Sequence, residues 1–167
     1  MEPADLVEIH AIERLKYAYL RCLDQKLWDD LEQLFTEDAT ASYGGGAAVF
    51  GDRAGIMDFL RTSMGTTKML TSHKCHHPEI DLTGPDTATG VWALEDVVVL
   101  TGEGGAGGVT IRGAAFYTDQ YVKVDGQWRI KHTGYKRTYE EIQSREGVPG
   151  LRLTADWFET DGRSSLI

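Results

Sequence analysis

The chain has 167 residues, 41% of them hydrophobic, and a formal net charge of −9 at pH 7. This length predicts a single domain over residues 1–167, large enough to bury a core and an internal cavity. The acidic balance argues against nucleic acid, whose phosphates need clustered Lys and Arg, and no apolar run reaches the ~20 residues that span a bilayer.

The first third of the chain has the periodicity of helices. Apolar residues recur at steps of three or four over residues 6–23, with Tyr19 on the inward stripe and Asp24 at the end of the run. We expect a second short helix over residues 28–35, a strand over residues 39–43, and a third helix over residues 52–63. The acidic, polar N-terminal segment is unlike a secretory signal, so we expect a cytoplasmic protein.

The remaining chain has the pattern of strands. We expect a short strand over residues 79–83 and longer strands over residues 87–100, 110–124 and 127–137. A glycine-rich loop is predicted over residues 102–108, and Asp125-Gly126 is a strong signal for a two-residue hairpin turn. Helices followed by an antiparallel meander indicate an α+β domain. Its core should span about residues 5–142, with a C-terminal tail over residues 143–167 that packs on this core or on a neighbouring copy.

Three of the five histidines lie close together, at His73, His76 and His77. A histidine held by a carboxylate is a ready general acid or base near neutral pH. We therefore expect Asp24 and His73 to form a dyad in an apolar pocket. The alternatives are that Asp24 caps the helix that follows it and that His73 is a buried structural histidine.

A metal site is the rival interpretation of the histidine cluster. No second group of ligands accompanies it at a suitable spacing, so we predict no metal. The glycines at residues 102–108 lack the Lys-Ser/Thr of a phosphate-binding loop. We therefore reject nucleotide binding and expect no cofactor.

Two further choices depend on side-chain direction. Glu95 and Asp96 are neighbours in a strand, so one of them must face inward, and the residues alone do not decide which. On an ideal helix Tyr17, rather than Tyr19, shares a face with Asp24. Tyr17 is therefore a reserve candidate, and the helix must loosen before Asp24 if Tyr19 is to act with it.

Several segments between about residues 9 and 142 match one protein family in combination. They are Tyr19–Asp24, His73 with His76–Ile80, Asp86–Gly90, Leu94–Asp96, Gly113–Asp119, Asp125–Trp128, Thr133–Tyr135, Arg137 and Tyr139–Glu141. In these residues the chain resembles the bile-acid 7α-dehydratases, which are SnoaL-like proteins of the nuclear transport factor 2-like superfamily. The glycine-rich loop and the tail after Ile142 depart from the family pattern.

The resemblance implies a fold, an assembly and a set of site residues. The implied fold is a cone-shaped α+β barrel, in which a curved mixed or antiparallel sheet wraps around N-terminal helices, and the implied assembly is a homotrimer. The implied catalytic residues are Tyr19, Asp24 and His73, and the implied substrate-binding residues are Arg137, Asp96, Tyr43 and Tyr117.

The implied activity is cofactor-independent removal of water from a hydroxylated 3-oxo-4-ene steroid or bile acid, as the free acid or as a coenzyme A thioester. His73 suits the proton transfer, Tyr19 could donate to the leaving hydroxyl or to the carbonyl oxygen, and Arg137 could bind a substrate anion or stabilise developing charge. Two alternatives stay open: a steroid isomerase or polyketide cyclase on the same scaffold, and a non-catalytic ligand-binding module.

Overall fold

The computed structural model describes residues 2–102 and 107–166. Residues 103–106, the middle of the predicted glycine-rich loop, lie outside these ranges. The elements found within the described ranges are α1 (Pro3–Gln25), α2 (Trp28–Gln33), β1 (Phe35–Tyr43), β2 (Ala48–Phe50), α3 (Arg53–Met64), β3 (Met69–Gly84), β4 (Thr87–Leu100), β5 (Val109–Val124) and β6 (Gln127–Ser144).

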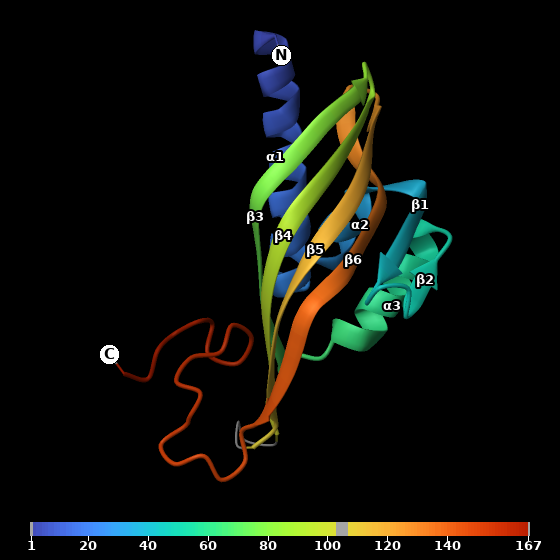
Figure 1. The fold of residues 1–167 in the computed structure, drawn as a ribbon. Coiled ribbons are helices and arrows are strands. Elements are labelled where there is room, and N and C mark those ends of the chain that lie inside the picture. The colour runs from blue at the N-terminus through green and yellow to red at the C-terminus, as the bar shows by residue number, and fades with distance from the viewer. Residues whose placement is uncertain (1, 103–106, 167) are drawn as a thin grey trace.

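The strands form one mixed sheet in the order β2-β1-β6-β5-β4-β3. Strands β3 to β6 make an antiparallel meander, whereas β1 pairs with β6 in parallel. The sheet curves strongly and the helices lie on one side of it (Figure 1). Because β2 and β3 remain its two edges, the sheet is an open cone rather than a closed barrel. The predicted α+β class and the cone of sheet around N-terminal helices are confirmed.

Helix α1 supplies the first wall of the interior. Glu2 and Asp5 form a reciprocal capping box at its start, with Pro3 at the first helical turn. Its apolar stripe buries Ile12 and Tyr19, whereas Leu6 near its start is 56% exposed. At the other end Lys26 takes a left-handed φ of 57°, which ends the helix and turns the chain toward α2.

Strand β3 is much longer than the predicted residues 79–83. It begins at Met69 and pairs with β4 along its length, interrupted by a bulge at which His77 has a φ of 48°. The prediction was wrong because two inward-facing positions before the bulge are polar, Thr71 and His73, and both bind Asp24 of α1. A strand whose buried face is hydrogen-bonded rather than apolar lacks the alternation on which the prediction relied.

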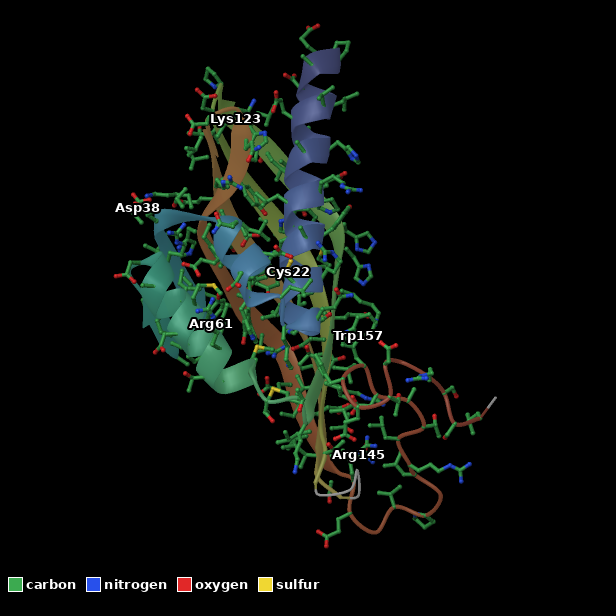
Figure 2. All side chains as sticks on the ribbon, turned by 180° about the vertical axis from the view of Figure 1, so that it is seen from behind. Cys22, Asp38, Arg61, Lys123, Arg145 and Trp157 are labelled. Carbon is green, nitrogen blue, oxygen red and sulfur yellow. The ribbon has the colours of Figure 1, made fainter. Side chains whose placement is uncertain are left out.

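The segment after β6 packs back on the domain beside β3, where Figure 2 labels Trp157. The Lys26 ammonium lies 5.3 Å from the centre of the Phe158 ring. Buried Asp156 accepts hydrogen bonds from the backbone N–H groups of Phe158 and Glu159, which closes a tight turn. Among the helices of the described ranges, none is long and apolar enough to cross a membrane.

Candidate active site

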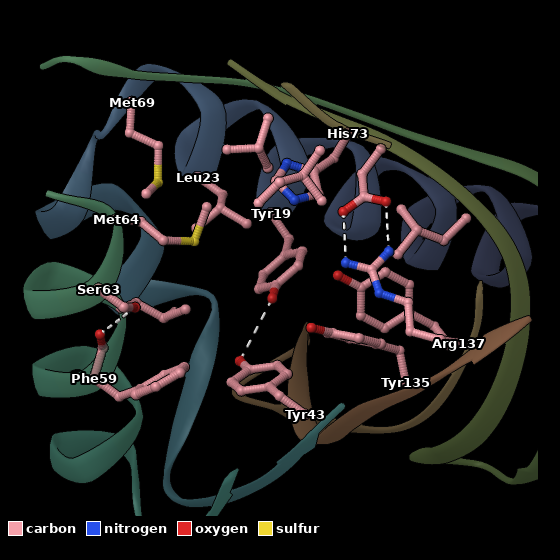
Figure 3. Close-up of a pocket in the computed structure, with 16 residues that line it drawn as sticks. Tyr19, Leu23, Tyr43, Phe59, Ser63, Met64, Met69, His73, Tyr135 and Arg137 are labelled. Atoms are coloured by element: carbon pink, nitrogen blue, oxygen red, sulfur yellow. Dashed lines mark hydrogen bonds and ion pairs between the residues drawn. The ribbon is translucent and has the colours of Figure 1, made fainter. Parts of the chain in front are cut away.

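A cavity of about 240 Å³ lies between the inner face of the sheet and helices α1 and α3 (Figure 3). Its wall is mainly aliphatic and aromatic, and its polar groups are concentrated on a few tyrosines, one histidine and one ion pair. The lining residues are Tyr19, Leu23, Tyr43, Phe59, Leu60, Ser63, Met64, Met69, His73, Leu94, Asp96, Val98, Ile111, Tyr117, Tyr135 and Arg137.

Asp24 and His73 form the predicted pair. His73 Nδ1 lies 2.6 Å from Asp24 Oδ1, and the backbone N–H of His73 donates to Asp24 Oδ2 at 2.9 Å. Thr71 donates its hydroxyl to Asp24 Oδ1 at 2.8 Å. An ionised carboxylate only accepts, so it holds the histidine as the tautomer with a proton on Nδ1 and leaves Nε2 as the basic atom.

The histidine ring stands between the carboxylate and the cavity. The His73 side chain is 8% exposed and lines the cavity, whereas Asp24 lies outside the lining with its side chain 22% exposed. In the described part of the chain, Nε2 of His73 has no hydrogen-bond partner. The arrangement presents one basic nitrogen to whatever fills the cavity.

The alternative role for Asp24 as a helix cap is wrong. Asp24 lies within α1, and the residue that caps α2 is Leu27, which makes no side-chain capping bond. All three hydrogen bonds to the Asp24 carboxylate come from β3 instead. The carboxylate therefore joins the C-terminal end of α1 to the edge strand of the sheet.

Tyr19 lies in the cavity wall and Tyr17 does not. Tyr19 is 1% exposed and its hydroxyl lies 3.5 Å from that of Tyr43 (Figure 3), whereas Tyr17 is 46% exposed. Helix α1 continues to Gln25, so the expected loosening before Asp24 is wrong. It is not needed, because Asp24 acts on β3 at one side of the helix while Tyr19 reaches the cavity from another.

Three cavity tyrosines are held in the neutral form. Burial raises the pKa of Tyr19, Tyr43 and Tyr117 well above the usual value for a phenol, and neighbouring phenols and Asp119 raise it further. Each of these hydroxyls therefore keeps its proton at neutral pH. The cavity contains hydrogen-bond donors that carry no charge.

Asp96 and Arg137 form a two-bond ion pair on the sheet wall of the cavity, where Asp96 on β4 is paired in register with His73 on β3. Arg137 donates from Nη1 to Asp96 Oδ1 at 2.5 Å and from Nη2 to Oδ2 at 2.9 Å (Figure 3). Asp96 is 5% exposed, whereas the side chain of its neighbour Glu95 is 71% exposed. The inward residue of the two is thus Asp96. Burial would lower the pKa of Arg137, but the hydrogen bonds and charge of Asp96 outweigh it and raise this pKa.

Gly113 makes room for this ion pair. Asp96 on β4 is paired in register with Gly113 on β5, and Arg137 comes from β6 on the other side. A Cβ on Gly113 would lie 2.6 Å from Arg137 Nη1 and 3.1 Å from Asp96 Oδ1. Only a residue without a side chain lets the two partners meet across the middle strand.

The cavity also contains residues that were not predicted to belong to the site. Tyr135 lies two residues before Arg137 on β6, so strand alternation places both on the same face. Phe59, Ser63 and Met64 come from the C-terminal half of α3. Because Tyr135 is two residues from Arg137, the strand period could have predicted that it faces the cavity. Nothing local in the sequence shows that α3 closes one side of this cavity.

The other two histidines of the cluster lie away from this site. His76 and His77 are exposed, and His76 Nε2 lies 4.0 Å from Glu95 Oε2. The bulge at His77 also breaks the simple alternation that would put it on the face of His73. Within the described residues, no group of three or more His, Cys, Asp or Glu side chains is placed to hold a metal ion.

Comparison with solved structures shows the same fold in other proteins. A candidate scytalone dehydratase from Novosphingobium aromaticivorans DSM 12444 is 26% identical, with a TM-score of 0.75 over 91% of this chain and 100% of that chain. The hexachlorocyclohexane dehydrochlorinase LinA-type3 from Novosphingobium barchaimii LL02 is 19% identical, with a TM-score of 0.71 over 89% of this chain and 95% of that chain. A family model described as a SnoaL-like domain matches residues 4–134, which include all three helices and most of the sheet, and the chain belongs to this family.

Proposed function

We propose that the protein is a cofactor-independent hydro-lyase, which removes water from a hydroxylated, carbonyl-activated ring compound. The observation that carries this proposal is the Asp24–His73 pair at the wall of a largely apolar cavity. Asp24 engages Nδ1 of His73 at 2.6 Å, so Nε2 is the atom available to a substrate. An imidazole that is fixed by a carboxylate and presents Nε2 to an apolar space is suited to taking a proton from carbon.

The reaction needs only atoms that the substrate and His73 supply. Nε2 takes a proton that the carbonyl group activates, either directly or through a conjugated double bond, and the electron pair of that C–H bond delocalises onto the carbonyl oxygen. The pair then returns to form the new C=C bond as the C–O bond to the hydroxyl breaks. The departing hydroxide takes the proton that His73 holds and leaves as water. Asp24 stabilises the imidazolium that exists in between, and proton transfer of this kind is typically worth ~10²–10⁴-fold in rate.

The buried phenols are suited to the negative charge that develops on the carbonyl oxygen. Tyr19, Tyr43 and Tyr117 line the cavity as neutral donors, because burial raises their pKa. Donors that are already in place stabilise such an oxyanion more strongly than water does. We assign the carbonyl oxygen to Tyr19 and Tyr43, whose hydroxyls lie 3.5 Å apart.

The finer proposal for the substrate is a 3-oxo-4-ene steroid or bile acid with a hydroxyl to eliminate, which rests on the resemblance to bile-acid 7α-dehydratases. The cavity of about 240 Å³ is smaller than the ~300–1,000 Å³ of pockets that enclose a drug-sized ligand. A steroid would therefore bind with its reacting rings inside and the remainder beyond the mouth. The likeness to a candidate scytalone dehydratase, at 26% identity, supports elimination of water as the reaction class.

Mass spectrometry and ultraviolet absorbance test this proposal directly. Purified protein is incubated with a 7α-hydroxy-3-oxo-4-ene bile acid, and separately with its coenzyme A thioester. We expect the product to have lost one water and to absorb at longer wavelength, as a dienone does. A product of unchanged mass with a shifted double bond would instead identify an isomerase, and a bound substrate recovered unchanged would identify a ligand-binding module.

A further inference from the structure

The guanidinium group of Arg137 is already paired with two carboxylates of the protein. Both Nη atoms donate to Asp96, and Nε lies 3.0 Å from Glu140 Oε2. Two carboxylates thus surround one guanidinium, and each of its three nitrogens already faces an oxygen. The planar group that could hold a carboxylate in two bonds is engaged by Asp96 in that same geometry.

The burial of the ion pair and its place over Gly113 keep Asp96 bonded to Arg137. Asp96 is 5% exposed and the Arg137 side chain is 22% exposed. The pair bridges β4 and β6 over Gly113, where a Cβ would collide with Arg137 Nη1 at 2.6 Å. The glycine lets the pair lie flat against the sheet as part of the cavity wall, and burial makes an exchange of Asp96 for solvent costly.

The other polar groups of the cavity offer no uncompensated positive charge. Tyr19, Tyr43 and Tyr117 are neutral phenols, and His73 has the Asp24 carboxylate directly behind it. A carboxylate that entered would lose its hydration without gaining a free cation as partner, which is unfavourable. A hydroxyl or carbonyl group on a ring would find phenols and an imidazole with which to form hydrogen bonds.

We infer that the cavity selects electrically neutral ring compounds and that Asp96 is the residue which sets this selectivity, by occupying Arg137. Any acidic tail of the substrate stays outside the mouth. The inference rests on the proposed function only in taking this cavity as the substrate site. It reverses the expectation that Arg137 binds a substrate anion.

Binding of two matched ring compounds tests the inference without measuring turnover. The probes are 2-naphthol and 2-naphthoate, which share a bicyclic ring; near neutral pH a phenol is uncharged and a carboxyl group is ionised. By isothermal titration calorimetry, we expect the unmodified protein to bind 2-naphthol at least about tenfold more tightly than 2-naphthoate, the order of one charge-assisted hydrogen bond. Equal affinities, or no binding of 2-naphthol, would overturn the inference.

The substitution Asp96→Asn tests the residue that sets the selectivity. It keeps the shape of the side chain but removes the negative charge that pairs with the two Nη atoms of Arg137, whereas Glu140 contacts only Nε. The freed Nη atoms can then hold a carboxylate in two bonds, so the affinity for 2-naphthoate should rise at least about tenfold while that for 2-naphthol changes little. The matched control is Glu95→Gln, which removes the same charge from the outward face of the same strand. Equal gains in the two variants would show a general effect of net charge and overturn the role of Asp96. Should Asp96→Asn fail to fold, the two affinities of the unmodified protein still decide the selectivity.

The outcomes separate this inference from the proposed function. Selective binding of 2-naphthol without any loss of water from a hydroxy-ketone would contradict the hydro-lyase and leave the selectivity standing. Loss of water from neutral substrates, together with equal affinities for 2-naphthoate and 2-naphthol, would support the hydro-lyase and contradict the selectivity.

Discussion

The Asp24 carboxylate decides what His73 is able to do. It accepts three hydrogen bonds from β3, of which one fixes the tautomer of the ring. A carboxylate held in this way orients a histidine and stabilises its protonated form. The catalytic proposal therefore depends on a contact between residues 49 positions apart in the chain.

The pairing of Asp24 with His73 was predicted because a carboxylate and a histidine are complementary and because the family resemblance places both in the catalytic set. Complementarity alone would not select Asp24 among the 26 acidic residues of the chain. The helical period also placed Tyr19 on the inward stripe, and its burial confirms this prediction. The reserve role of Tyr17 was wrong. Tyr17 shares a helix face with Asp24, but the histidine comes from β3, so the angle between a tyrosine and Asp24 on α1 does not decide which tyrosine reaches the cavity. The direction of Asp96 likewise depends on which face of β4 is covered, which a strand sequence does not record.

The buried phenols predict how the folded protein titrates. Burial raises the pKa of Tyr19, Tyr43, Tyr117 and Tyr121 well above the usual value, so these four should stay neutral in the folded protein at about pH 10, where a tyrosine in an unfolded chain is half ionised. Phenolate absorbance at that pH should therefore be much lower in buffer than in concentrated urea. Identical titration curves in the two solvents would contradict the described burial.

The raised pKa values of these tyrosines also make the stability of the fold depend on pH. A group that holds its proton more tightly when folded contributes stability in full below its unfolded pKa, and this contribution falls as the pH rises further. The free energy of unfolding should therefore decline above about pH 10. Urea unfolding followed at a series of pH values measures it.

At the scale of elements, the meeting of β4, β5 and β6 shapes the site. Their antiparallel register puts Asp96 beside Gly113, and the missing side chain of the glycine lets Arg137 cross from β6. Helix positions and the later strands were predictable because they follow simple periods. Strand β3 before residue 79 was not, because Thr71 and His73 on its inner face are satisfied by Asp24 rather than by apolar packing.

Substitution of Gly113 by alanine tests this arrangement. The new Cβ would lie 2.6 Å from Arg137 Nη1 and 3.1 Å from the backbone oxygen of Tyr139, so the ion pair or the strand must shift. We expect the free energy of unfolding to fall by about 1–3 kcal/mol, as for other overpacked sites. The matched control is Gly51→Ala, where nothing lies within 4 Å of the added atom. Equal urea midpoints for the two variants would contradict the tight approach.

At the scale of the whole molecule, the sheet leaves apolar groups on the face away from the helices. Phe116 is 53% exposed and Tyr139 is 55% exposed, on neighbouring strands β5 and β6. Phe116 alternates along β5 with the buried residues Ala115 and Tyr117, so it points away from the cavity. We propose that this face takes part in the homotrimer implied by the family resemblance.

Light scattering coupled to size-exclusion chromatography tests the trimer. The expected molar mass is three times the 18.5 kDa of one chain. Phe116→Glu would place a charge in the proposed interface and should lower the measured mass, whereas Glu37→Gln, at an exposed position on β1, should not. A mass of one chain at every concentration would contradict the proposal.

The central claim is that His73 transfers the proton, and the rate of water loss by a His73→Gln variant tests it most directly. The product is followed by mass spectrometry, with His76→Gln as the matched control because His76 is an exposed histidine of the same strand. Relative to the unmodified protein, we predict that kcat falls by about 10²–10⁴-fold in His73→Gln and is unchanged in His76→Gln. A His73→Gln variant that removes water at the unmodified rate would contradict the account.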